Sequence, residues 1–173
     1  MKREKLMPIL KWAIYALLLL LFYVLQTTPG LFQIFGAKPV LVLALAVCVS
    51  MYEGVMASAM FSMAAGLLWD ISSDKLFGFN GLIFLCCGLM ISLLCIYYLR
   101  TKLWNSLLFC GVTLVVQGLL DYVFYYAMWN LENTHLILLR TILPNAAYTL
   151  AVTPLVFLLV RLIENRFTQT PRA

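Results

Sequence analysis

The chain has 173 residues, of which 64% are hydrophobic and 11% are charged, and its formal net charge is +5. So few polar residues cannot cover the surface of a water-soluble domain, and the composition therefore indicates an integral membrane protein. No polar tract is long enough to form a separate soluble catalytic domain. We therefore expect a single integral membrane domain over residues 1–173, all-α and built as a polytopic bundle of about six helices.

The predicted helices begin with a basic stretch followed by an apolar run. No small-residue cleavage site follows Gln26, so this run is interpreted as a retained first helix rather than a signal peptide. Pro29 and Gly30 end it. From Pro39 to Trp69 only Glu53 is charged, and two short helices or one long tilted helix both fit that length. The approximate spans are 9–26, 39–52, 54–69, 82–99, 103–128 and 136–162.

Charge bias decides between five and six spans. Six spans place nine basic residues on one side: Lys2, Arg3, Lys5, Lys11, Arg100, Lys102, Arg161, Arg166 and Arg172. The opposite side then carries three: Lys38, Lys75 and Arg140. Five spans would divide the basic residues evenly between the two sides of the membrane. The positive-inside rule favours six spans with both termini in the cytoplasm, which requires a tight cytoplasmic turn at Glu53.

Small residues recur every four positions along the third predicted helix. They are Gly54, Ser58, Ser62 and Gly66, with Asp70 one turn further on. Such spacing lets two helix backbones approach closely in lipid. Two interpretations of Asp70 stay open: it caps the membrane exit, or it makes a fixed polar contact to a loop or a partner protein. Gly78 and Gly81 permit the turn into the next helix.

The last two predicted helices each carry polar residues at a four-residue spacing. They are Thr113, Gln117, Asp121 and Tyr125 in one, and Thr141, Asn145, Thr149 and Thr153 in the other. Lipid penalises an exposed carboxylate, so Asp121 should face the bundle interior. These residues either join helices or line a ligand or ion pathway.

An ion pair between Asp121 and Arg140 is one expectation, and the alternative is that Arg140 extends to the membrane surface. Asn145 or Tyr148 could complete the hydrogen bonds of the carboxylate. The predicted intramembrane polar cluster is therefore Gln117, Asp121, Arg140, Asn145 and Tyr148.

Residues for catalysis, cofactor binding or metal binding are not predicted. The cysteines lie in apolar runs without metal-ligand spacing: Cys48, Cys86, Cys87, Cys95 and Cys110. His135, the single histidine, has neither a nucleophile nor a second ligand near it in the sequence. Nucleotide-binding signatures do not occur. We therefore expect no enzyme activity, no cofactor and no nucleic-acid partner.

Three segments carry a resemblance to a known family. QTTPG, KPVLVLALAV and EGVMASAMFSMAAGLLWDISSDKLFGFNGL together resemble the rod shape-determining protein MreD family. Members show a proline before an apolar run, a glycine-rich helix ending in GLxxD, and a glycine before the next span. The matching positions here are Pro39, Gly66, Leu67, Asp70, Gly78 and Leu82. From Leu103 onward the chain matches in hydropathy.

The resemblance implies a noncatalytic inner-membrane component of the bacterial cell-elongation (rod) complex, which helps to organise side-wall peptidoglycan synthesis and cell shape. MreC is the expected partner, and RodA, a class B penicillin-binding transpeptidase and the actin-like MreB are further partners. The family fold is similar to the membrane substrate-binding subunits of energy-coupling-factor transporters. That similarity leaves an alternative, a vitamin-type binding subunit of a transporter, with a pocket formed by Arg140, Asp121, Asn145 and Tyr148.

Overall fold

The computed structural model describes residues 2–28, 39–73, 76–127 and 143–167, all of whose regular structure is helical. The elements are α1 (Lys2–Thr27), α2 (Leu41–Tyr52), α3 (Val55–Ser72), α4 (Phe79–Tyr97), α5 (Leu103–Asp121), its π-helical extension η1 (Tyr122–Ala127) and α7 (Leu143–Phe167). Within these ranges the expectation of an all-α bundle with six α-helices is confirmed.

Residues 39–69 form two helices rather than one long tilted helix. The break lies at Glu53 and Gly54, whose backbones are extended, with φ/ψ of −93°/158° and −66°/159°. Earlier in the chain, α1 ends just before Pro29, because proline cannot continue the helical hydrogen bonds. The hydroxyl of Thr27 donates to the carbonyl of Tyr23, one turn earlier in α1, at 2.8 Å.

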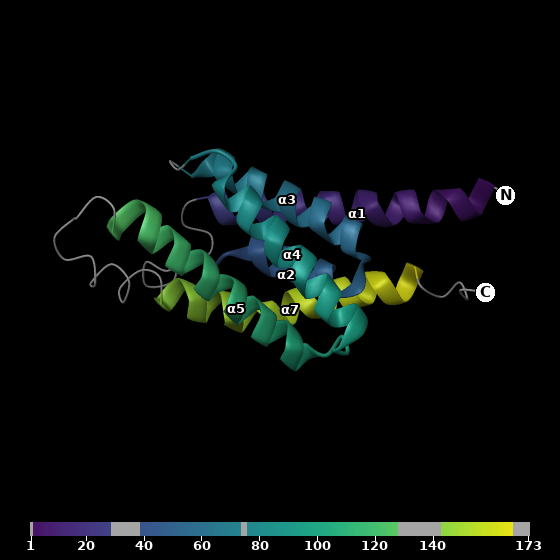
Figure 1. Cartoon of the computed structure of the whole chain (residues 1–173). Helices are drawn as coiled ribbons and strands as arrows, with labels where there is room; N and C mark the ends of the chain where they lie inside the picture. Colours follow the sequence, from purple (N-terminus) through teal and green to yellow (C-terminus); the bar gives the residue numbers. More distant parts are fainter. Residues whose placement is uncertain (1, 29–38, 74–75, 128–142, 168–173) are drawn as a thin grey trace.

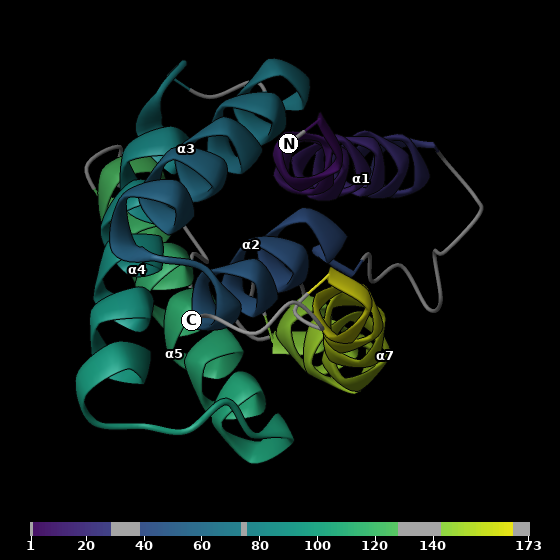
Figure 2. The same ribbon diagram turned by 90° about the vertical axis from the view of Figure 1, so that its right-hand side faces the viewer.

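Helix α2 lies at the centre of the bundle. Every residue from Leu41 to Met51 is buried, and the view along the bundle shows the other α-helices around it (Figure 2). The remaining helices each expose part of their apolar surface. A helix that is apolar on all sides is stable only when neighbours surround it or lipid does, and here the neighbours do so.

Within the described ranges, five helices are long and apolar enough to cross a membrane: Ile9–Thr27, Val55–Ser72, Phe79–Tyr97, Leu103–Phe124 and Pro144–Phe167. Helix α2 has 12 residues and is therefore about 18 Å long, well short of the hydrocarbon core of about 30 Å. Five of the six described helices are thus candidate spans by length, the sixth is short and buried, and six crossings of the membrane stay a prediction. The charge count could not show that α2 is short, because it depends on how often the chain reverses direction and not on the length of each helix.

The two ends of the bundle, which Figure 1 shows from the side, differ in their number of basic residues. We call the end with the start of α1, the break at Glu53, residues 98–102 and the end of α7 the terminal end; the end of α3 and the start of α4 lie at the far end. All lysines and arginines of the described ranges lie at or near the terminal end. They are Lys2, Arg3, Lys5, Lys11, Arg100, Lys102, Arg161 and Arg166.

Candidate functional site

Asp70, in the last turn of α3, is the centre of a buried hydrogen-bond network at the far end. Its Oδ2 accepts the backbone N–H groups of Gly78 at 2.9 Å and Gly81 at 3.1 Å. Its Oδ1 accepts from Asn80, through the side-chain amide at 2.8 Å and the backbone N–H at 3.3 Å. The amide of Gln117 in α5 donates to Asn80 Oδ1 at 3.2 Å. The network therefore joins α3, α4 and α5.

This geometry explains why a carboxylate lies at the end of α3. Gly78 precedes α4 with φ +94°, a left-handed conformation that favours glycine, and it has no side chain with which to cap the helix. Asp70 supplies that cap from the neighbouring helix, and its negative charge lies at the positive end of the α4 dipole. Asp70 thus makes a fixed contact to the turn and to the start of α4.

The residues at four-residue spacing in α3 lie against α4 and α2. Ser58, Ser62, Gly66 and Asp70 are buried, whereas Gly54, which precedes α3, is exposed. A Cβ added to Gly66 would lie 2.5 Å from the carbonyl oxygen of Asn80 and 2.7 Å from Gly81 Cα. The backbones of α3 and α4 are therefore in direct contact at this point.

Serine hydroxyls and a glycine continue this contact towards the middle of the bundle. The Oγ atoms of Ser50 in α2 and Ser62 in α3 lie 3.0 Å apart. A Cβ on Gly88 in α4 would lie 2.7 Å from Ser62 Cβ. Three helices therefore meet closely where each has a small residue, as expected for packing in lipid.

A partly open cavity of about 110 Å³ lies between α3, α5 and α7. Gln117, Asp121 and Asn145 of the predicted polar cluster line it, together with Trp69. Tyr148 is partly buried but does not line it. Arg140 lies outside the described residues, and its ion pair with Asp121 stays a prediction.

Hydroxyl groups of two residues from the polar series at four-residue spacing, Thr149 and Thr153, join α7 to its neighbours. Thr149 Oγ1 accepts the backbone N–H of Val40 at 2.9 Å and donates to the carbonyl of Asn145 at 2.7 Å. Thr153 Oγ1 lies 3.2 Å from Cys110 Sγ in α5. The contacts of Thr149 with Val40 and of Thr153 with Cys110 thus connect α7 to the start of α2 and to α5.

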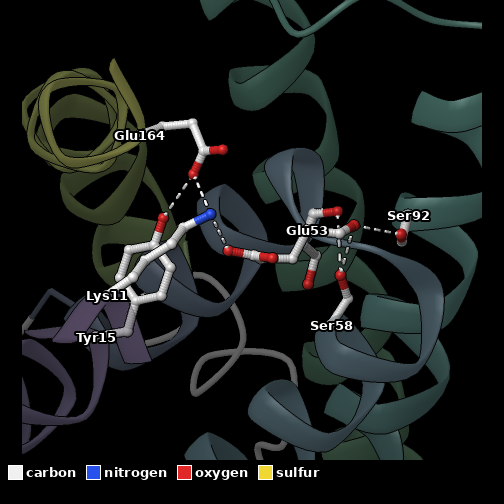
Figure 3. Close-up of polar contacts among 7 residues, drawn as sticks. Lys11, Tyr15, Glu53, Ser58, Ser92 and Glu164 are labelled. Carbon is white, nitrogen blue, oxygen red and sulfur yellow. Dashed lines mark hydrogen bonds and ion pairs between the residues drawn. The ribbon is translucent and has the colours of Figure 1, made fainter. Parts of the chain in front are cut away.

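A second buried cluster lies at the terminal end (Figure 3). Lys11 Nζ lies 2.6 Å from Glu53 Oε1 and 2.7 Å from Glu164 Oε2, and each of the three side chains is less than one-fifth exposed. The hydroxyl of Tyr15 donates to Glu164 Oε2 at 3.2 Å. The cluster therefore connects α1, the α2–α3 break and α7.

The break itself is held by side chains of two helices. The carbonyl oxygen of Glu53 accepts hydrogen bonds from the hydroxyls of Ser58 in α3 at 3.1 Å and Ser92 in α4 at 2.9 Å. The backbone N–H of Glu53 donates to the carbonyl of Val49 at 3.1 Å. The backbone N–H and C=O groups of Glu53 are thus both hydrogen-bonded within the protein.

Sequence reasoning did not identify the Lys11 cluster. It counted Lys11 with the basic residues that set topology, it placed Glu53 at a turn, and it did not consider Glu164. One signal was available: Lys11 and Glu53 each lie in or beside an apolar helix, where a charge needs a partner. Over the described ranges, no group of three or more His, Cys, Asp or Glu residues could hold a metal ion.

Five apolar helices around a short buried one, joined by internal polar contacts, define a multi-pass helical membrane protein. The family model of the rod shape-determining protein MreD matches residues 7–163, and the chain belongs to that family. The family is noncatalytic and functions in bacterial cell shape. No curated protein and no solved structure matches the chain, so the expected similarity to energy-coupling-factor subunits has no support.

Proposed function

We propose that this protein is an inner-membrane scaffold of the cell-elongation complex, which helps MreC to organise side-wall peptidoglycan synthesis, with both termini in the cytoplasm. The match to the MreD family over residues 7–163 carries this proposal. The clusters around Asp70 and Lys11 support it, because each fixes three helices by contacts within the bundle. Internally fixed helices present a constant surface to partner proteins.

The family gives the rod complex as the setting, and we propose MreC as the direct partner. RodA and a class B penicillin-binding transpeptidase are proposed as further membrane partners, and MreB as a cytoplasmic one. The cationic terminal end supports this orientation, because basic residues are enriched on the cytoplasmic side of membrane proteins.

The alternative of a vitamin-type binding subunit is disfavoured by the size of the cavity beside Asp121. That cavity has about 110 Å³, whereas pockets for small organic ligands usually have about 300–1,000 Å³. The polar side chains that line it therefore surround space for a few waters rather than for a vitamin.

Affinity purification in a mild detergent, followed by identification of the recovered proteins, tests the scaffold. We expect MreC to be recovered with the tagged chain and not with an equally tagged, unrelated multi-pass protein. Recovery of an ATPase-coupled transport module, without any component of the rod complex, would contradict the proposal.

A further inference from the structure

A cavity at the terminal end has no part in the function proposed above. It has about 390 Å³ and lies between the last residue of α2, the first residue of α5 and α7. Helix α7 contributes Phe157, Arg161 and Asn165, whose four-residue spacing places them on one face. The ring of Tyr52 packs on that of Phe157, with centroids 5.9 Å apart, and supplies an apolar wall.

The cavity is cationic. Among the residues that the structure describes, its lining contains Lys102 and Arg161 and no carboxylate. The two acidic residues nearest to it in the sequence, Glu53 and Glu164, both bind Lys11. An anion in the cavity would therefore meet two positive charges.

The start of α5 adds hydrogen-bond donors to these charges. Lys102 is the N-cap residue and makes no side-chain cap, so the first N–H groups of α5, from Leu103 on, are not satisfied by the helix. Unsatisfied N–H groups at the start of a helix favour the binding of an oxyanion. Arg161 adds a fork of N–H donors that matches phosphate geometry, and Asn165 adds an amide.

The neighbouring aromatic side chains place the cavity at the membrane surface. Trp104 is 81% exposed, and Tyr97 and Tyr98 are 73% and 83% exposed. Trp and Tyr collect at the level of the lipid headgroups, where one part of the ring contacts hydrocarbon and another contacts water. Trp104 is separated from the cavity residue Lys102 by one residue, so the two cations lie at headgroup depth.

We propose that this cavity binds the phosphate of an anionic phospholipid headgroup from the leaflet at the terminal end. Arg161 and Lys102 neutralise the phosphate, and the N–H groups at the start of α5 complete its hydrogen bonds. The adjoining apolar helices then accommodate the acyl chains. A basic pocket between helices, on the side of the membrane with more positive charge, is the arrangement that recognises such headgroups.

The test compares two double variants of the purified full chain in mild detergent. Lys102→Gln with Arg161→Gln removes both charges of the cavity, whereas Arg100→Gln with Arg166→Gln removes two charges from the same end outside it. Phosphatidylglycerol is titrated, and the rise in the thermal unfolding midpoint reports binding. We expect a loss of affinity of about thirtyfold for the cavity variant and of at most about threefold for the control.

Three results would overturn the proposal. Equal losses in both double variants would show diffuse attraction to a basic surface. Equal stabilisation by phosphatidylcholine would remove the requirement for an anionic lipid. Equal stabilisation by inorganic phosphate would assign the cavity to a soluble anion. If the cavity variant does not fold, Lys102→Gln and Arg100→Gln alone give the same comparison, because both positions are exposed.

Discussion

At the scale of single residues, Asp70 is a buried carboxylate whose stability depends on hydrogen-bond donors. A carboxylate that is 3% exposed loses its hydration, and this loss is offset only by charge-assisted hydrogen bonds. Four donors meet it: the backbone N–H groups of Gly78, Asn80 and Gly81 and the amide of Asn80. The carboxylate thus combines the capping of α4 with the attachment of α3 to α4.

Asp70→Asn should lower the free energy of unfolding by about 3 kcal/mol. The substituted amide keeps the size of the side chain, but its NH₂ group faces backbone donors and leaves at least one of them unsatisfied. The measurement is thermal unfolding of the purified protein in detergent. Ser72→Ala, on the exposed side of the same helical turn, is the control and should have little effect. An unchanged midpoint for Asp70→Asn would contradict the role given to the carboxylate.

At the scale of helices, packing depends on where small residues coincide. Helices α3 and α4 touch through Gly66 and the backbone of Asn80 and Gly81, a contact that any larger side chain would separate. Within lipid no hydrophobic force drives helices together, so this contact relies on close fit and on polar bonds.

Gly66→Ala should destabilise the protein by about 1–3 kcal/mol, because its methyl group would overlap backbone atoms that cannot rotate away. Gly111→Ala is the matched control in a helix, since its nearest new contact would be Leu150 Cδ2 at 3.8 Å. Alanine favours the helix there, so we expect no loss. Thermal unfolding in detergent gives both values, and equal stability of the two variants would exclude a close contact at Gly66.

The Lys11 cluster connects helices that are far apart in the sequence. It holds the first helix to the last one and to the break before α3. Both carboxylates depend on the one shared cation, because each of the three side chains is largely withdrawn from water.

Lys11→Met should reduce the free energy of unfolding by about 3 kcal/mol, since it leaves Glu53 and Glu164 without their shared cation. Adding Glu164→Gln should restore part of the loss, and the double-mutant cycle measures the coupling. Arg166→Met at the exposed end of α7 serves as the control. A coupling energy of zero would mean that the ion pairs do not hold α1 to α7.

At the scale of the whole molecule, the position of the basic residues and the lengths of the helices both bear on how the bundle is oriented in the membrane. Consecutive α-helices run in opposite directions along the bundle, so that α1 begins and α7 ends at the same cationic end (Figure 1). The short α2 keeps this alternation of direction, and the five longer helices enclose it (Figure 2).

A membrane-impermeant thiol reagent applied to intact cells tests the orientation. Leu76→Cys at the far end is 75% exposed and should be labelled from outside. Thr101→Cys at the terminal end should be labelled only after the cells are permeabilised. The natural chain, with its five cysteines, measures the background. Labelling of Thr101→Cys in intact cells would reverse the proposed orientation.

Properties that depend on residues close together in the chain could be predicted from the amino-acid sequence. Hydropathy identified a membrane protein, and Pro29 and the segment around Glu53 marked helix ends, since composition and backbone restriction act locally. The spacing from Ser58 to Asp70 placed these residues on one face of α3, because the helical period is known in advance. The quoted motifs were also sufficient to indicate the family that the comparison shows.

Which polar groups contact one another depends on how the helices pack, and sequence patterns did not reveal these contacts. Asp70 could be recognised as a carboxylate in need of donors, but its donors became known when the start of α4 was placed against it. Tyr15 and Glu164 are 149 residues apart and share a hydrogen bond through the packing of α1 on α7. Helix α2 is buried for the same reason: a buried helix and a lipid-facing one have the same apolar composition, and only the neighbouring helices distinguish them.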